Sequence, residues 1–179
     1  MGWEERLLGV LDDLEQQAEG LALAARDVDV AELGRAEYAE VDLAARLHAS
    51  VGRVVQLDLP GWGRREVVLE RAGRGCAVVR EARPGAQAAV LNLDHLRGAS
   101  GLDPGARPEE LRRVTARLGL ASALRHLAEE VERVTVVRTD GERRTGALAR
   151  LGADFVEVVG EAGHVEVLPL AVVVAVSPA

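Results

Sequence analysis

Short runs rich in Val and Leu, separated by glycine-containing turns, dominate the chain from residue 51 onward. The first four are VGRVVQLDL, REVVLER, GCAVVREA and AQAAVLNL, with PGWG, AGRG and RPGA between them. Runs of this length and composition predict strands, and the Gly and Pro between them predict tight turns. Four short strands within about 45 residues must curl to bury one apolar face, so we expect a small antiparallel barrel.

The second half of the chain repeats this organisation. Its runs are VTVVRT, RRTGALARL, FVEVV, HVEVL and AVVVAV, with a turn at Asp140-Gly141 after the first. LHASVGRVVQL aligns with LAEEVERVTVV, ERAGRGCAVV with ARLGADFVEV, and VLNLDHLRGA with VLPLAVVVAV, at an offset that drifts only from 80 to 77. The shared order of helix, strands and glycine turn predicts a duplication, in which a helix and a small barrel occur twice.

The N-terminal segment has a different character. Residues 1–50 hold 12 acidic residues against 4 arginines, whereas residues 51–179 hold 17 against 18. An apolar stripe at steps of three and four predicts a helix over residues 3–25. A second helix is expected to about Ser50, with Asp27 or Asp29 as its cap, and the short connection predicts a helical hairpin, although a single bent helix is also compatible. The stripe that could contact a partner helix comprises Leu7, Leu11, Leu14 and Leu21.

The stretch VRTDGERRTGALARLGADFVEVV resembles the first signature of the Sm-like small barrels, which share an SH3-like fold. The matching positions are Asp140, Gly141, Gly146, Leu148, Asp154 and Phe155, and Leu96-Arg97-Gly98 is similar to the second signature. The resemblance implies the barrel fold. It does not imply the family's RNA pocket, because Glu157 or Val158 stands where that pocket has an Asn. The exclusive use of Arg as the basic residue fits a bacterial genome of high GC content.

These observations together predict an α+β fold. An acidic helical hairpin (1–50) precedes two small antiparallel Sm/SH3-like β-barrels (51–101 and 132–179), which a linker and helix (102–131) join. Pro108 suits the first turn of that helix.

The sequence offers no catalytic or metal-binding constellation, so we expect a non-enzymatic protein without metal or cofactor. The four histidines share no ligand spacing with one another or with Cys76, and nucleophile elbows and phosphate loops are missing from the sequence. Cys76 lies in the apolar run CAVV, where a buried, inert thiol is expected. The acidic start MGWEERLL is unlike an export signal, and every apolar run is too short for a membrane span, so a cytoplasmic location is expected.

Two functions follow as hypotheses. The first is a protein-binding or adaptor role, with a protein partner or a second copy bound through the N-terminal helices. The alternative is an RNA- or DNA-binding regulator that uses paired arginines at equivalent hairpins, Arg64 with Arg65 and Arg143 with Arg144. The scarcity of aromatic residues for base stacking, 2% of the chain, and the net charge of -7 favour the first hypothesis.

Overall fold

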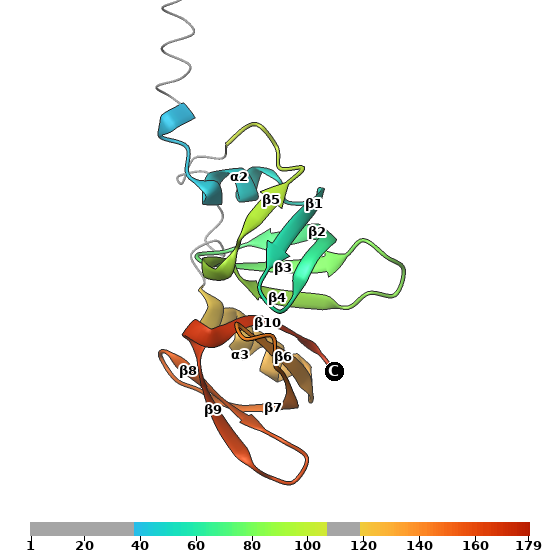
Figure 1. Ribbon diagram of the computed structural model, residues 1–179, viewed down its shortest axis with the longest axis vertical. Coiled ribbons are helices and arrows are strands. Elements are labelled where there is room, and N and C mark those ends of the chain that lie inside the picture. The colour runs from blue at the N-terminus through green and yellow to red at the C-terminus, as the bar shows by residue number, and fades with distance from the viewer. Residues whose placement is uncertain (1–37, 107–118) are drawn as a thin grey trace, which may run out of the picture. The chain divides into compact units, whose positions relative to one another are not determined.

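Ten antiparallel strands form one continuous sheet in a computed structural model that describes residues 38–106 and 119–179 (Figure 1). The strand order is β5-β1-β2-β3-β4-β10-β6-β7-β8-β9. The strands are β1 (Val54–Leu59), β2 (Gly63–Ala72), β3 (Cys76–Glu81), β4 (Ala88–Asn92), β5 (Gly98–Ser100), β6 (Val134–Arg138), β7 (Arg143–Leu151), β8 (Phe155–Val159), β9 (Val165–Pro169) and β10 (Val173–Pro178).

The same order of elements occurs twice along the chain. A helix, four strands, a 3₁₀ turn and a fifth strand run from α2 (Leu43–Ala49) to β5, and again from α3 (Leu120–Glu130) to β10. The 3₁₀ turns are η1 (Leu93–His95) and η4 (Leu170–Val172). In each half the fifth strand pairs with the first, as β5 with β1 and β10 with β6. The strand positions predicted from the sequence are confirmed, apart from β5, which was not predicted.

The two halves meet where β4 pairs with β10. Val90 lies opposite Val176, and Leu91 lies opposite Ala175. Asn92, at the end of β4, is buried, and its Nδ2 donates to the carbonyl oxygens of Val173 (3.0 Å) and Leu170 (3.3 Å). The joint therefore combines a short backbone ladder with side-chain hydrogen bonds.

The central strands are buried on both faces, and this explains the continuous sheet. Successive side chains of a strand point to opposite faces, so β4 contributes Leu91 to one apolar core and Val90 to the other. Likewise, β10 contributes Ala175 to the first core and its neighbour Val176 to the second. Each core is otherwise built mainly by its own half of the chain.

The predicted fold class is therefore wrong. The expectation was two separate closed barrels, but the ten strands form one open antiparallel sheet, with one short α-helix per half within residues 42–106 and 119–179. Closing each half on itself would leave the second apolar face of β4 and β10 in water, whereas pairing these strands buries it. Asp42–Ala179 forms one compact unit.

The predicted helices fall only partly within the described residues. The leucine stripe at 7–21 lies outside them, as does the predicted start at Pro108. The second helix does not run unbroken to Ser50. Asp42 has extended backbone angles (φ -80°, ψ 158°), and its side chain caps α2 by accepting from the Ala45 N–H at 2.5 Å. Neither α2 nor α3 has the length and apolar character needed to cross a bilayer.

Candidate functional site

The two arginine-bearing hairpins meet at their tips. Gly61, in the β1–β2 turn, has φ +64°, and a Cβ placed on it would lie 2.7 Å from both the Arg138 carbonyl oxygen and the Cα of Gly141. The backbone of one hairpin therefore touches that of the other, which requires glycine at this point. This contact brings together the hairpins that carry the predicted pairs of arginines.

The first arginine pair is held by acidic neighbours. Arg65 forms an ion pair with Glu81, donates from Nε to the Trp62 carbonyl at 3.0 Å and stacks over the Trp62 ring at 4.8 Å. Arg64 lies 3.3 Å from the Asp58 carboxylate. The Arg83 side chain donates a hydrogen bond to Glu81 and thereby lowers the pKa of that carboxyl.

The two arginines of the second pair differ in their contacts. Arg144 contacts the carboxylates of Glu142 (2.5 Å) and Glu166 (3.0 Å), and their charges raise the pKa of its guanidinium. Arg143 is exposed and makes no ion pair within residues 38–106 and 119–179. Three of the four predicted arginines are thus matched by carboxylates, which leaves Arg143 as the predicted arginine without an ion pair among the described residues.

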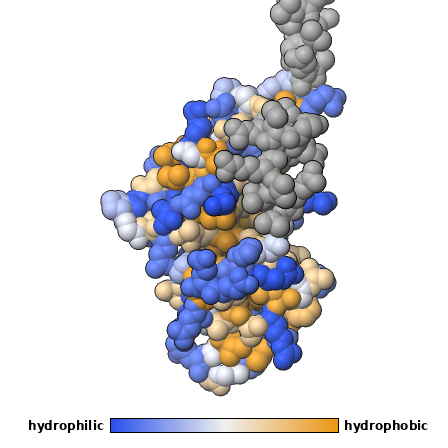
Figure 2. Space-filling model, turned by 180° about the vertical axis from the view of Figure 1, so that it is seen from behind, coloured by the Kyte–Doolittle hydropathy of each residue, from blue (hydrophilic) through white to orange (hydrophobic). Residues whose placement is uncertain are grey.

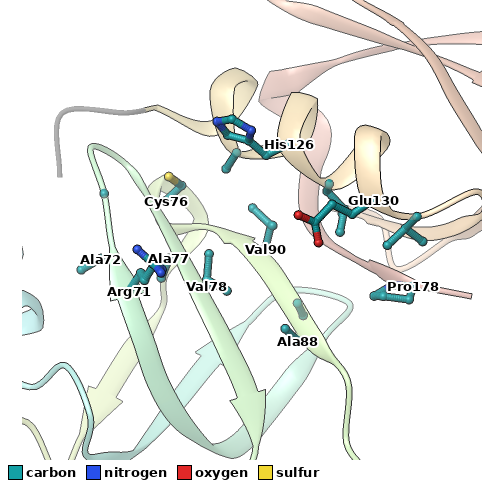
Figure 3. A pocket seen from close by; sticks show the side chains of 15 residues that line it. Arg71, Ala72, Cys76, Ala77, Val78, Ala88, Val90, His126, Glu130 and Pro178 are labelled. Carbon is teal, nitrogen blue, oxygen red and sulfur yellow. The ribbon is translucent and has the colours of Figure 1, made fainter. Parts of the chain in front are cut away.

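An apolar cavity of about 550 Å³ opens between β3, β4 and α3 (Figure 3). Val78 and Val90 line it from the sheet, and Leu127 lines it from α3. His126 and Glu130 are the charged or titratable side chains that α3 adds. Such a cavity can accept an apolar group, but its lining provides few polar groups to fix the orientation of a ligand.

Cys76 also lines this cavity without being poised for reaction. Burial, assisted by the charge of Asp94, raises the pKa of the Cys76 thiol to about 11. The thiol is therefore neutral near pH 7 and a poor nucleophile. Within the described parts of the chain, no three His, Cys, Asp or Glu side chains are grouped as metal ligands.

The edge strand β9, whose outer side pairs with no strand in the part of the chain that the structure describes, is the second feature available to a partner. Gly160 N–H donates to the His164 carbonyl (2.9 Å), and Leu170 N–H donates to the Asp154 carbonyl (2.7 Å). Hydrogen-bonded and non-hydrogen-bonded residue pairs alternate along an antiparallel ladder. Because His164 and Leu170 belong to hydrogen-bonded pairs, the even-numbered residues of β9 form the backbone hydrogen bonds to β8. The backbone groups of Val165 and Val167 consequently point away from the sheet.

The side chains along β9 are also apolar and accessible. Val165 is 49% exposed and Val167 is 57% exposed. Figure 2 shows apolar surface, between charged side chains, in the lower part of the molecule. An edge with unpaired backbone groups and exposed valines is a surface on which another strand can add.

The sequence indicated the arginine hairpins but did not identify which strands lie at the edges of the sheet. The apolar runs VLNL and AVVVAV lack polar–apolar alternation, the signal of a strand buried on both faces. That signal could have identified β4 and β10 as central strands, which leaves β5 and β9 as the edges. The leucine stripe of the predicted partner-binding helix lies outside the described residues.

Comparison with protein-family models, with curated proteins and with solved structures gave no match for this chain.

Proposed function

We propose that this chain is a non-enzymatic protein-binding or adaptor protein that captures an extended segment of its partner along β9. The observation that carries the proposal is the outward-facing backbone of Val165 and Val167, together with the exposure of their side chains. A partner strand would satisfy these backbone groups and bury the two valines.

Strand addition fits the chemistry of this edge. Main-chain hydrogen bonds supply affinity for almost any extended segment, and the alternating side chains select its sequence. Pro169 has a carbonyl but no N–H, so Val165 and Val167 are the outward positions that can both donate and accept. The preferred partner segment would therefore be short and apolar.

The predicted helix with Leu7, Leu11, Leu14 and Leu21 remains part of the proposal as a second contact, to a partner helix or to a second copy. The proposed setting is the cytoplasm, where the chain's one cysteine, buried in β3, stays reduced.

A peptide of residues 170–179 with a solubilising tail tests the β9 proposal, because β10 is the strand that pairs with β4, the counterpart of β9. We expect saturable binding to the full chain by fluorescence anisotropy. Val167→Pro removes one outward N–H and should abolish binding, whereas Val167→Thr keeps that N–H and should retain most of it. Equal binding by both variants, with the fold intact by circular dichroism, would refute strand addition at β9.

An RNA- or DNA-binding regulator is the second candidate, and the meeting of the two hairpins favours it. It predicts binding of a labelled oligonucleotide that weakens steeply with salt, because released counterions supply the affinity. Changing Arg143 and Arg144 to Ser should reduce this binding, and Arg65→Ser provides a comparison within the other hairpin. If no oligonucleotide binds at low salt, this candidate is excluded.

A further inference from the structure

The two edge strands of the sheet, β5 and β9, pair with one strand each among residues 38–106 and 119–179, and they are the counterparts of the two strands that join its halves. β9 occupies in the second half the place that β4 occupies in the first, and β5 likewise corresponds to β10. Inside the chain, the surfaces of β4 and β10 bind each other. We propose that β9 of one copy pairs with β5 of another, so that the chain assembles head to tail and extends the sheet between copies. This inference rests on the proposed function and names its partner as a second copy.

The internal joint shows which residues would meet. The Leu93 N–H donates to the Gly75 carbonyl (2.8 Å), and the Ala179 N–H donates to the Arg133 carbonyl (3.0 Å). Alternation along these two ladders directs the backbone groups of Val90 and Val176 towards each other.

The offset of 77 between the halves maps this pair onto the edges. Val90 corresponds to Val167, and Val176 corresponds to Ala99. Val90 and Val176 are 5% and 1% exposed, whereas Val167 is 57% exposed. The strand pairing that buries Val90 and Val176 within the chain therefore has no counterpart at β9, where Val167 stays exposed.

The backbone of β5 directs its free hydrogen-bonding groups outward at the position that this pairing requires. Leu69 N–H donates to the Arg53 carbonyl (3.0 Å), so the odd-numbered residues of β1 bond to β2. Ala99 lies opposite Leu57 and therefore directs its N–H and carbonyl to the open edge. Val167 and Ala99 thus present complementary donors and acceptors, as Val90 and Val176 do.

One difference weakens the contact between copies. Asn92, which donates two hydrogen bonds across the internal joint, corresponds to Pro169, which has no donor. We therefore expect reversible, concentration-dependent assembly. A head-to-tail contact uses two different surfaces, so it keeps adding copies unless the rotation between them closes the assembly into a ring.

Sedimentation velocity of the full chain at increasing concentration tests the inference. We expect mass above the monomer, and Val167→Pro should raise the dissociation constant at least about tenfold, as for the loss of one hydrogen bond at an otherwise paired edge. Val167→Thr, which keeps the N–H, should associate more tightly than Val167→Pro.

Covalent capture tests the register. Glu166 and Ser100 would lie opposite each other as a non-hydrogen-bonded pair, where the Cα separation of about 4.5 Å suits a disulfide. Oxidised Glu166→Cys/Ser100→Cys protein should form a ladder of multimers, whereas either single variant should stop at dimers. Cys76 is buried and its pKa is about 11, so it should not contribute.

The outcomes separate this inference from the proposed function. If the chain stays monomeric and forms no ladder while the 170–179 peptide binds in a Val167→Pro-sensitive manner, β9 captures foreign strands and head-to-tail assembly is refuted. If neither the peptide nor a second copy binds, both proposals fail.

Discussion

Replacing Asn92 with alanine should weaken the joint between the two halves of the sheet. The Asn92 side chain is 4% exposed; it donates to two carbonyl oxygens of the second half and accepts from the Asp94 N–H at 3.2 Å. Asn92→Ala removes all three hydrogen bonds and leaves the carbonyls of Leu170 and Val173 without this donor. At a net contribution of about 1 kcal/mol per bond, plus the desolvation of unpaired groups, we expect a loss of about 2–4 kcal/mol in the free energy of unfolding.

Urea unfolding followed by circular dichroism measures this loss. For a urea m-value of about 2 kcal/mol/M, the midpoint should fall by about 1–2 M without a change in m. Gln56→Thr is the control, because this exposed strand position on β1 lies away from the joint and should shift stability by less than about 0.5 kcal/mol. An Asn92→Ala effect no larger than that of the control would refute the hydrogen-bonded joint.

Three further predictions follow from the hairpins and β3. Gly61→Ala should lower the free energy of unfolding by about 1–3 kcal/mol more than Gly63→Ala, because both glycines have positive φ but only a Cβ at Gly61 meets backbone atoms. Equal urea midpoints for the two variants would show that the hairpins do not touch. The Cys76 thiol, with a pKa of about 11, should react with a disulfide reagent at pH 8 only after unfolding, and reaction at the rate of an exposed thiol would contradict its burial. The lowered pKa of Glu81 means that its carboxylate stabilises the fold above about pH 4.5, and this contribution is lost as the pH falls through the lowered value. Glu81→Gln should therefore destabilise by about 0.2–1 kcal/mol at pH 7 and by less near pH 3, measured from urea midpoints; a pH-independent effect would contradict this.

Local structure could be predicted from the sequence better than long-range pairing. The Val- and Leu-rich runs and glycine turns gave nine of the ten strands, because alternation and turn chemistry are local properties. The strand that pairs with a given strand edge can be far away in sequence. Nothing in the first half alone shows that β4 pairs with β10. We assigned AVVVAV to the second of two separate barrels, although its apolar character on both faces indicated a central strand.

The break before α2 and the distant carboxylate partners of the arginines were missed. Asp42 was included in a longer helix, although Asp is a favoured N-cap and α2 begins after it here. The equivalence of the two arginine hairpins was seen in the sequence, and they do meet. Two of their carboxylate partners, Glu81 and Glu166, come from strands 15 or more residues away in sequence, so these two ion pairs required the fold, whereas Asp58 and Glu142 are close in sequence.

Nuclear Overhauser effects between β4 and β10 test the continuous sheet most directly. Leu91 and Ala175 form a non-hydrogen-bonded pair, in which the two Hα atoms approach closely. We predict a strong Hα–Hα cross-peak between these residues at a concentration where the chain is monomeric. If cross-peaks occur between β1 and β2 and between β6 and β7 but not between Leu91 and Ala175, the halves are separate sheets, and the account of their joint and of its counterparts at the open edges is wrong.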